Sequence, residues 1–199
     1  MTSTRVTKPS RKEQILEIAL GLFAARGYHA VSVDDVGAAA GVTGPALYHH
    51  FSGKEDMLAQ ALEPVSRQLL RGAQRIAIEH AGNASGTLGA LVEFHVGFAL
   101  ENPAIITLHL HELERLPADS RRVIRRVQRR YVERWVDVLC ELAPGKSRDT
   151  GRAAALAAFG LMNSTPFLLR SDSSAVGSGE LRALLCAMAI AALTHGRTS

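Results

Sequence analysis

The sequence predicts an all-α protein of about nine helices, and three observations support this fold class. Apolar residues recur three and four positions apart from Ile15 almost to the C-terminus, which is the spacing of one helix face. Stretches of strand length in which apolar and polar residues alternate are almost absent. Hydrophobic residues make up 47% of the 199 residues, which is sufficient for a sizeable core in one or two domains.

Polar residues at the start of each periodic segment predict where the first helices begin. Ser10 is suited to be the N-cap of a helix over residues 11–26. Ser32 is followed three residues later by Asp35, which is an aspartate variant of the capping box. This pair predicts a short second helix that ends at Gly41.

The later helices are predicted in the same way. Thr43 is the expected N-cap of a short third helix, and Pro45 lies in its first turn, where a missing N–H costs little. Ser52 and Glu55 have the full capping-box spacing and open a long helix over residues 54–80. The remaining predicted helices cover residues 85–100, 103–114, 120–142, 147–169 and 180–195.

Composition excludes several classes of protein. The formal net charge of +4 permits a polyanionic partner but does not identify one. The two cysteines, Cys140 and Cys186, lie in apolar helical patterns, so a disulfide scaffold and a CxxC zinc site are excluded. We interpret both as core thiols of a cytoplasmic protein, and we expect no cofactor. No signal-like segment or run of about 18 uncharged apolar residues occurs, so we expect no membrane association.

The second and third helices, joined across "AGVT", have the arrangement of a helix-turn-helix over residues 32–51. The outer face of the third helix begins with small residues, which allow a helix to enter the major groove closely, and its free N–H groups can receive a phosphate. Tyr48 can hydrogen-bond another phosphate, and Lys54 adds a backbone contact. The residues predicted to contact double-stranded DNA are Thr43, Gly44, Pro45, Ala46, Tyr48, His49 and Lys54.

The adjacent histidines of "LYHHF" raise the alternative of a metal site. Neighbouring residues on a helix point about 100° apart, and no third ligand lies nearby in the sequence, so zinc is disfavoured. We expect His50 and Phe51 to pack on the small N-terminal unit.

Two motifs carry a resemblance to a known family. The first comprises Gly41, Val42, Thr43, Leu47, Tyr48, His50, Phe51, Lys54, Glu55 and Leu58. The second comprises Arg11, Ile15, Leu16, Ala19, Leu22, Phe23, Gly27 and Tyr28. At these residues the sequence resembles the TetR family of bacterial transcriptional regulators. The family often has a lysine or another polar residue where this chain has Gly44, and glycine where it has Pro45, so its base preference is not transferred from relatives.

The resemblance implies a helix-turn-helix DNA-binding domain over residues 11–71 and a helical ligand-binding and dimerisation domain over residues 72–199. The last two long helices would pair with their twins in a four-helix bundle, and their Ala, Leu and Gly content agrees with close helix packing. The alternative is that they are interior helices of a monomer. The expected function is a homodimeric repressor that binds a palindromic operator and is released by a small-molecule effector. Activation of transcription remains an alternative.

The most charged predicted helix, over residues 120–142, has two interpretations. Two rows of arginines run beside its apolar stripe; they are Arg121, Arg125 and Arg129, and Arg122, Arg126, Arg130 and Arg134. Family members that answer to acyl-coenzyme A thioesters look similar here, which implies an apolar or amphipathic, lipid-like effector. The other interpretation is a solvated face on which Glu133 and Asp137 pair with nearby arginines.

Candidate ligand-binding residues come from the arginine-rich helix and from two polar breaks in apolar segments. In "NSTP" a polar notch precedes Pro166, which leaves a backbone carbonyl free, although Ser164 or Thr165 could satisfy this kink. One histidine of "LHLHELE" could also line a pocket. The candidates are His109, Arg125, Arg129, Tyr131, Trp135, Asn163 and Thr165.

The same His/Glu cluster suggests the alternative of a metal-dependent enzyme. His109 and His111 diverge by about 200° on a helix, so a metal site would need His95 or another helix. No nucleophile elbow, phosphate-cradling glycine loop or HExxH pair is present in the sequence. We therefore expect neither a metal site nor an enzyme.

Overall fold

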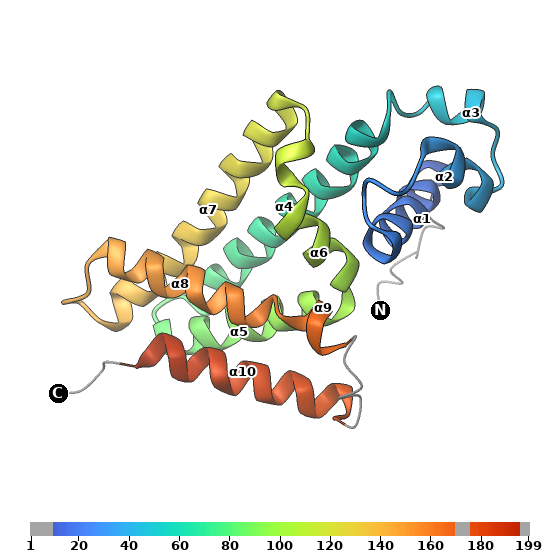
Figure 1. Cartoon of the computed structure of the whole chain (residues 1–199). Helices are drawn as coiled ribbons and strands as arrows, with labels where there is room; N and C mark the ends of the chain where they lie inside the picture. The colour runs from blue at the N-terminus through green and yellow to red at the C-terminus, as the bar shows by residue number, and fades with distance from the viewer. Residues whose placement is uncertain (1–9, 170–175, 196–199) are drawn as a thin grey trace, which may run out of the picture.

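The structure, a computed structural model, describes residues 10–169 and 176–195, and in that part of the chain it contains helices and no strand (Figure 1). The predicted all-α fold class is confirmed. The elements are α1 (Arg11–Arg26), α2 (Val33–Ala40), α3 (Gly44–Tyr48), α4 (Lys54–Glu79), α5 (Ala84–Glu101), α6 (Pro103–His111), η1 (Leu113–Arg115), α7 (Ala118–Leu142), α8 (Arg148–Met162), α9 (Thr165–Leu168) and α10 (Ser178–Thr194).

The first two helices begin at the predicted caps. Ser10 Oγ accepts a hydrogen bond from the backbone N–H of Glu13 at 3.2 Å, and the Glu13 carboxylate accepts from the Ser10 N–H at 2.7 Å. Ser32 and Asp35 form the same reciprocal pair at 3.0 and 2.7 Å. The donated hydrogen bonds favour the ionised carboxylates, so they lower the pKa of both Glu13 and Asp35. The predicted N-cap at Ser10 and the predicted capping box at Ser32 are confirmed, and the reciprocal bond from Ser10 to Glu13 adds a box that was not predicted.

The starts of α3 and α4 differ from the prediction. Thr43 is the N-cap of α3, but its side chain makes no capping hydrogen bond. The N-cap of α4 is Gly53, so Ser52 lies one residue before it. The Ser52 N–H therefore donates to Asp56 Oδ2 at 2.8 Å, and the predicted pairing of Ser52 with Glu55 is wrong.

The predicted helix over residues 147–169 is two helices. α8 ends at Met162 and α9 begins at Thr165, with Asn163 and Ser164 between them. Pro166 has no N–H to donate to the Met162 carbonyl, so the hydrogen-bond ladder of α8 cannot continue through this point. Similarly, the helix predicted to end at residue 114 ends at His111 and is followed by the short 3-10 helix η1.

A proline corner joins α5 to α6, and the two helices are bent by 94° there. In a continuous helix the N–H of residue 103 would donate to the Ala99 carbonyl, but Pro103 has no N–H. The hydroxyl of Thr165 donates to that carbonyl instead, at 3.0 Å. Thr165 is fully buried and belongs to this corner, so the structure does not support its predicted role in ligand binding.

Two hydrophobic cores divide α4 between them. The first encloses α1, α2, α3 and the start of α4, and it also includes Leu108 of α6 and Ile124 of α7. The second contains the later part of α4 with α5, α7, α8 and α10. Figure 1 shows α4 leading from one unit into the other. The N-terminal unit therefore completes its core with residues from beyond position 71.

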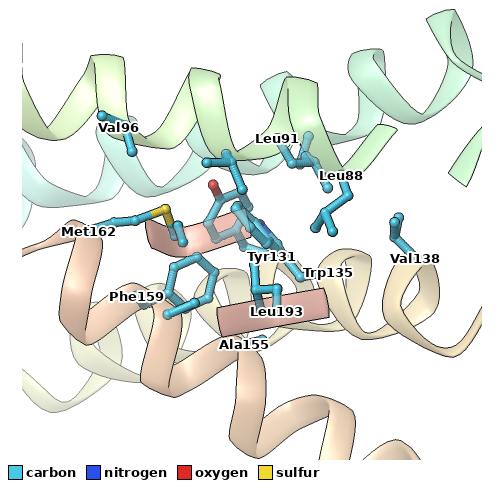
Figure 2. Packing of buried hydrophobic residues seen from close by; sticks show 14 of the residues in the cluster. Leu88, Leu91, Val96, Tyr131, Trp135, Val138, Ala155, Phe159, Met162 and Leu193 are labelled. Carbon is cyan, nitrogen blue, oxygen red and sulfur yellow. The ribbon is translucent and has the colours of Figure 1, made fainter. Parts of the chain in front are cut away.

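The larger core is centred on aromatic side chains. Figure 2 shows Tyr131 and Trp135 of α7 side by side, with Phe159 and Met162 on α8 facing them. Trp135 is 0% exposed and its ring packs edge-on against Phe159, with ring centroids 4.9 Å apart. Trp135 therefore belongs to the core, and its role in ligand binding stays a prediction.

The two cysteines lie at the edge of the core and not inside it, in contrast to the prediction. Both are half-buried. The Cys186 thiol donates to Glu93 Oε2 at 3.0 Å. Burial, together with the nearby Glu93 carboxylate, raises the pKa of Cys186 to about 12.

We searched the described helices for one that could span a membrane. No single helix among them is long and apolar enough to cross a membrane. Only α5 and α6 taken together reach that length and apolar composition, and the two are bent sharply against each other.

We expect Thr165→Val to lower the free energy of unfolding by about 1–3 kcal/mol, because the change leaves the buried Ala99 carbonyl without its donor. Urea denaturation measures the effect. As a control, Thr150→Val removes an exposed hydroxyl near the start of α8 and should change stability by less than about 0.5 kcal/mol. Equal effects of the two substitutions would show that the Thr165 hydroxyl does not stabilise the corner.

Candidate functional site

A tight turn places α3 against α2. Gly41 ends α2 in the left-handed conformation with φ 65° and ψ 38°, a region that a residue with a Cβ rarely adopts. The Val42 N–H then donates back to the Gly37 carbonyl at 2.9 Å. A Cβ on Gly37 would lie 3.0 Å from the Val42 carbonyl oxygen and 3.1 Å from Leu47 Cδ1. The lack of side chains at Gly37 and Gly41 therefore permits the close helix-turn-helix arrangement, and the sequence prediction did not include Gly37.

The short helix α3 is anchored by one residue and exposes most of the others. Leu47 is completely buried in the first core. Tyr48 is 59% exposed, Thr43, Pro45 and His49 are also exposed, and Gly44 and Ala46 are half-buried. These residues form the candidate nucleic-acid interface, and their contact with DNA stays a prediction.

The two residues after His49 behave differently from each other. Phe51 is buried in the first core, as predicted. His50 is exposed, so the prediction that it packs on the small unit is wrong. His50 only meets the edge of the Phe51 ring, with ring centroids 6.1 Å apart.

Lys54 has a structural role that the sequence prediction did not foresee. Its ammonium group donates to the backbone carbonyls of Tyr28 and Val31, at 2.7 and 2.6 Å, and lies 4.5 Å from the centre of the Tyr28 ring. These contacts tie the start of α4 to the segment between α1 and α2. Two of its three N–H donors therefore hold the N-terminal unit together, and its predicted contact with the DNA backbone stays a prediction.

A cavity of about 270 Å³ lies between α4, α5, α6, α7 and α8, and its lining is mostly apolar. Of the candidate ligand residues, His109, Tyr131 and Asn163 line it. The structure adds His95, Ser66 and Gln128, which the sequence prediction did not include as ligand residues. For His95 the available signal is a histidine in the largely apolar segment "LVEFHVGFAL", whereas Ser66 and Gln128 lie in polar segments that give no such signal.

Three polar side chains from three helices form a hydrogen-bonded chain at the wall of this cavity. His95 Nε2 lies 3.0 Å from Asn163 Oδ1, and His95 Nδ1 lies 3.0 Å from the Tyr131 hydroxyl. Because a carbonyl oxygen can only accept, Nε2 carries the proton and Nδ1 accepts from Tyr131. The His95 side chain is 4% exposed, and this burial lowers its pKa to about 4. His95 is therefore neutral at pH 7.

His109 is the second histidine of the cavity. Its Nε2 lies 3.4 Å from Ser66 Oγ, and that hydroxyl donates to the Leu62 carbonyl at 2.9 Å. Burial lowers the pKa of His109 to about 4, so this imidazole is neutral as well.

A second hollow, of about 500 Å³, adjoins the cavity. Gln128, Val132 and Leu156 line both, so the two spaces are neighbours. The second hollow adds three arginines, namely Arg125, Arg129 and Arg152. The structure thus brings the predicted residues Arg125 and Arg129 next to the apolar cavity.

Most arginines near this hollow are engaged in ion pairs. Arg125 pairs with Glu114, and Arg152 pairs with Glu133 at 2.8 Å. Glu133 and Asp137 find their arginines mainly on α8, since Arg148 contacts both carboxylates. Within the described part of the chain, Arg129 makes no ion pair. The predicted solvated, paired face thus accounts for much of α7 but leaves this cation available.

The residues of the alternative metal site are not brought together. His111 is exposed, Glu112 lies near Arg115, and Glu114 pairs with Arg121 and Arg125. Residues 10–169 and 176–195 contain no group of three or more His, Cys, Asp or Glu side chains that could hold a metal ion.

We expect Lys54→Met to lower the free energy of unfolding by about 1–3 kcal/mol, because it leaves two carbonyls without their donor while keeping the apolar stem. Urea denaturation measures the change. Arg75→Met is the control, since it removes an exposed cation of α4 and should cost less than about 0.5 kcal/mol. Normal stability of Lys54→Met together with weakened DNA binding would contradict the structural role.

We also expect acid to destabilise the protein through His95. Between the ordinary pKa of 6.5 and the folded value of about 4, the unfolded chain binds more protons than the folded chain. Stability present above pH 6.5 is therefore lost as the pH falls, by about 2 kcal/mol at pH 5 for this group. Urea denaturation at pH 5 and pH 7.5 measures the free energy of unfolding that is lost between the two. This loss should be smaller in His95→Phe than in the wild type, by the same amount. Replacement of the exposed His49 by Gln is the control, and an unchanged pH dependence in His95→Phe would refute the assignment.

Comparisons with known proteins agree with this architecture. A family model described as "Bacterial regulatory proteins, tetR family" matches residues 15–61, and "Tetracyclin repressor-like, C-terminal domain" matches residues 81–167. The HTH-type transcriptional repressor KstR2 of Rhodococcus jostii is 31% identical over 133 residues, which cover 66% of this chain and 65% of that protein. The match thus spans slightly less than two thirds of that curated relative.

Solved structures share the fold along nearly the whole chain. A TetR-family regulator from Bordetella parapertussis has a TM-score of 0.82 and 23% identity, covering 96% of this chain and 97% of that one. FadR from Bacillus subtilis, solved in complex with stearoyl-CoA, has a TM-score of 0.70 and 21% identity, covering 93% and 98%. The helix-turn-helix, the helical second core and both family matches lead to one conclusion. The chain belongs to the TetR family of bacterial regulatory proteins.

Proposed function

We propose that the protein is a sequence-specific transcriptional repressor that binds a palindromic operator as a homodimer and is released by a small-molecule effector. The observation that carries the DNA-binding part is the exposure of α3 beyond the buried anchor Leu47. A tight turn presents this helix, and its first residues are small. Such a surface fits the major groove, with Thr43 and Ala46 near base edges and Tyr48 on a phosphate.

Dimerisation through α8 and α10 is supported by their uncovered apolar side chains. Leu184 and Met188 on α10 are each about half exposed, at 51 and 47%, and Ala153 and Ala157 on α8 are exposed. α10 packs on α5 and α8, so its other side remains available. Pairing these faces across a two-fold axis would bury them and would place two copies of α3 on the two halves of a palindrome.

Helix α6 is suited to couple the effector to DNA binding. Leu108 of α6 belongs to the first core, around which α1 to α3 are built. Its neighbours His109 and Leu110 line the cavity in the second unit. An effector that shifts α6 must therefore disturb contacts of the N-terminal unit. It needs only to bind more tightly to the conformation that spaces the two α3 helices wrongly for DNA.

The effector is proposed to be amphipathic, with an apolar body and an anionic end. The cavity lining is mostly apolar, and the arginines of the adjoining hollow offer positive charge on one side. An acyl-coenzyme A thioester or a lipid-like carboxylate has this character. The structural relative FadR was solved with stearoyl-CoA, which supports this class of effector, although the likeness at 21% identity extends to the fold alone.

The alternative of a metal-dependent enzyme has no supporting observation in the described residues. His109 faces the cavity while His111 is exposed, and Glu114 is occupied by arginines.

The experiment that tests the DNA-binding proposal is footprinting of the intergenic DNA beside the gene. We expect protection of a palindrome, with affinity that falls steeply as salt rises because phosphate contacts release counterions. Tyr48→Ala should weaken binding by about tenfold through the loss of one phosphate contact. Ile78→Ala, a change at an exposed apolar residue of α4, should leave the affinity unchanged. No protected site at low salt would exclude the proposal.

A further inference from the structure

Asn163 offers a hydrogen-bond donor to the cavity that no described protein group uses. We propose that the effector carries a carbonyl oxygen in its apolar body, remote from its anionic end. This inference rests on the effector cavity proposed above. This oxygen accepts a hydrogen bond from Asn163 Nδ2, and Asn163 is the residue that selects effectors having it. The inference depends on which atoms of the polar chain are already occupied.

The orientation of the Asn163 amide, whose Oδ1 faces His95, sets the direction of each hydrogen bond in the chain. Asn163 Oδ1 accepts from His95 Nε2 at 3.0 Å, so the proton of the neutral imidazole is on Nε2. His95 Nδ1 is then an acceptor, and the Tyr131 hydroxyl donates to it at 3.0 Å. The Asn163 amide therefore has its oxygen occupied. Its Nδ2 makes no hydrogen bond within the described part of the chain, and it remains as a donor beside the cavity.

The amide is held in this orientation from two sides. The Asn163 backbone N–H donates to the Phe159 carbonyl at 2.8 Å, which fixes the residue at the end of α8. The His95 ring contacts the rings of Tyr131 and Phe159, with centroids 5.9 and 4.9 Å from its own, and these two rings also contact each other. Turning the amide over would require the His95 proton to move to Nδ1 and the Tyr131 hydroxyl to become an acceptor. The donor is thus oriented before any ligand arrives, which lowers the cost of binding.

A purely hydrocarbon body would leave this donor without a partner. Before binding, water can satisfy Nδ2, but a ligand that fills the cavity displaces that water. An unpaired buried donor costs about 1–3 kcal/mol, whereas a carbonyl oxygen in the same place restores the bond. The apolar remainder of the lining gives a hydrocarbon body no compensation for this loss. Discrimination against the ligand that lacks the carbonyl follows from this difference.

The carbonyl and the anionic end are assigned to different parts of the site. Asn163 lines the inner cavity but not the adjoining hollow, whereas Arg129 lines the hollow but not the inner cavity. Gln128 lies where the two meet. A ligand that reaches both ends therefore carries its acceptor far from its anion. This pattern describes an oxo-substituted apolar acid or thioester and excludes a plain saturated acyl chain as the preferred effector.

Two acids that differ in one distal group test the inference. The probes are 8-(4-oxocyclohexyl)octanoate and 8-cyclohexyloctanoate, and calorimetric titration into the full-length protein measures their affinities. We expect the oxo acid to bind about tenfold to a hundredfold more tightly. Asn163→Leu should abolish this preference. Asn163→Asp keeps the acceptor for His95 but replaces the donor by a second acceptor, so it should bind the oxo acid no better than the cyclohexyl acid.

Gln128→Leu is the matched control, because it removes the other amide of the cavity and should leave the preference within about threefold of the wild type. Fluorescence of the buried Trp135 verifies that each variant is folded. Equal affinity of the wild type for both acids would overturn the inference while leaving the effector cavity supported. Loss of the preference in Gln128→Leu but not in Asn163→Leu would also overturn it. Failure of both acids to bind would contradict the proposed cavity function itself and the inference with it.

Discussion

The packing of α6 between two cores is the constraint on which the arrangement of the whole chain depends. Leu108 is inserted into the core of the N-terminal unit, while Ile106 and His109 on the same helix face the cavity. The sharp α5–α6 corner makes this double contact possible, because it turns α6 away from the axis of α5. That corner is stabilised from the C-terminal side by Thr165. A tightly packed helix that belongs to two cores cannot adjust to one without changing the other. Coupling between the cavity and the DNA-binding face thus needs no additional element.

Burying the polar side chains at the cavity wall costs free energy unless each group has a hydrogen-bond partner. This requirement limits which atoms of His95, Tyr131 and Asn163 can bind a ligand. Tyr131 and His95 use each other, and His95 also uses Asn163, so the two buried groups are satisfied without solvent. The incomplete member is Asn163, which is half-buried and borders the cavity. Replacing a buried polar group and its partners by apolar residues of similar shape is often close to neutral for stability. Retaining a polar chain that ends in one oriented donor is therefore better explained by recognition than by stability, which is a hypothesis that the affinity measurements address.

The sequence predicted features that depend on local chemistry and missed those that depend on contacts between distant segments. The N-cap at Ser10 and the capping box at Ser32 were predictable because all their groups lie within four residues. The apolar stripe of α7 was predictable from its period, but the burial of Trp135 beneath α8 was not. The structural role of Lys54 was missed because its carbonyl partners lie 23 and 26 residues away in the sequence, so that only a phosphate contact was predicted. The structural role of Thr165 was missed for the same reason, since its partner Ala99 is 66 residues away in the sequence.

The arginine rows show why charge pattern alone does not identify an anion site. On a single helix, pairs at three or four residues are the expected partners. Here Arg148 and Arg152 of α8 occupy Glu133, and Glu114, which precedes α7, occupies Arg125. Seven arginines along α7 thus give much less free positive charge than their number indicates, because neighbouring elements supply carboxylates that the helix lacks. What distinguishes Arg129 is its position: it lines the hollow beside an apolar cavity and has no ion pair in the described part of the chain. The orientation proposed for the effector, with its anion at Arg129 and its carbonyl at Asn163, follows from these two unoccupied groups.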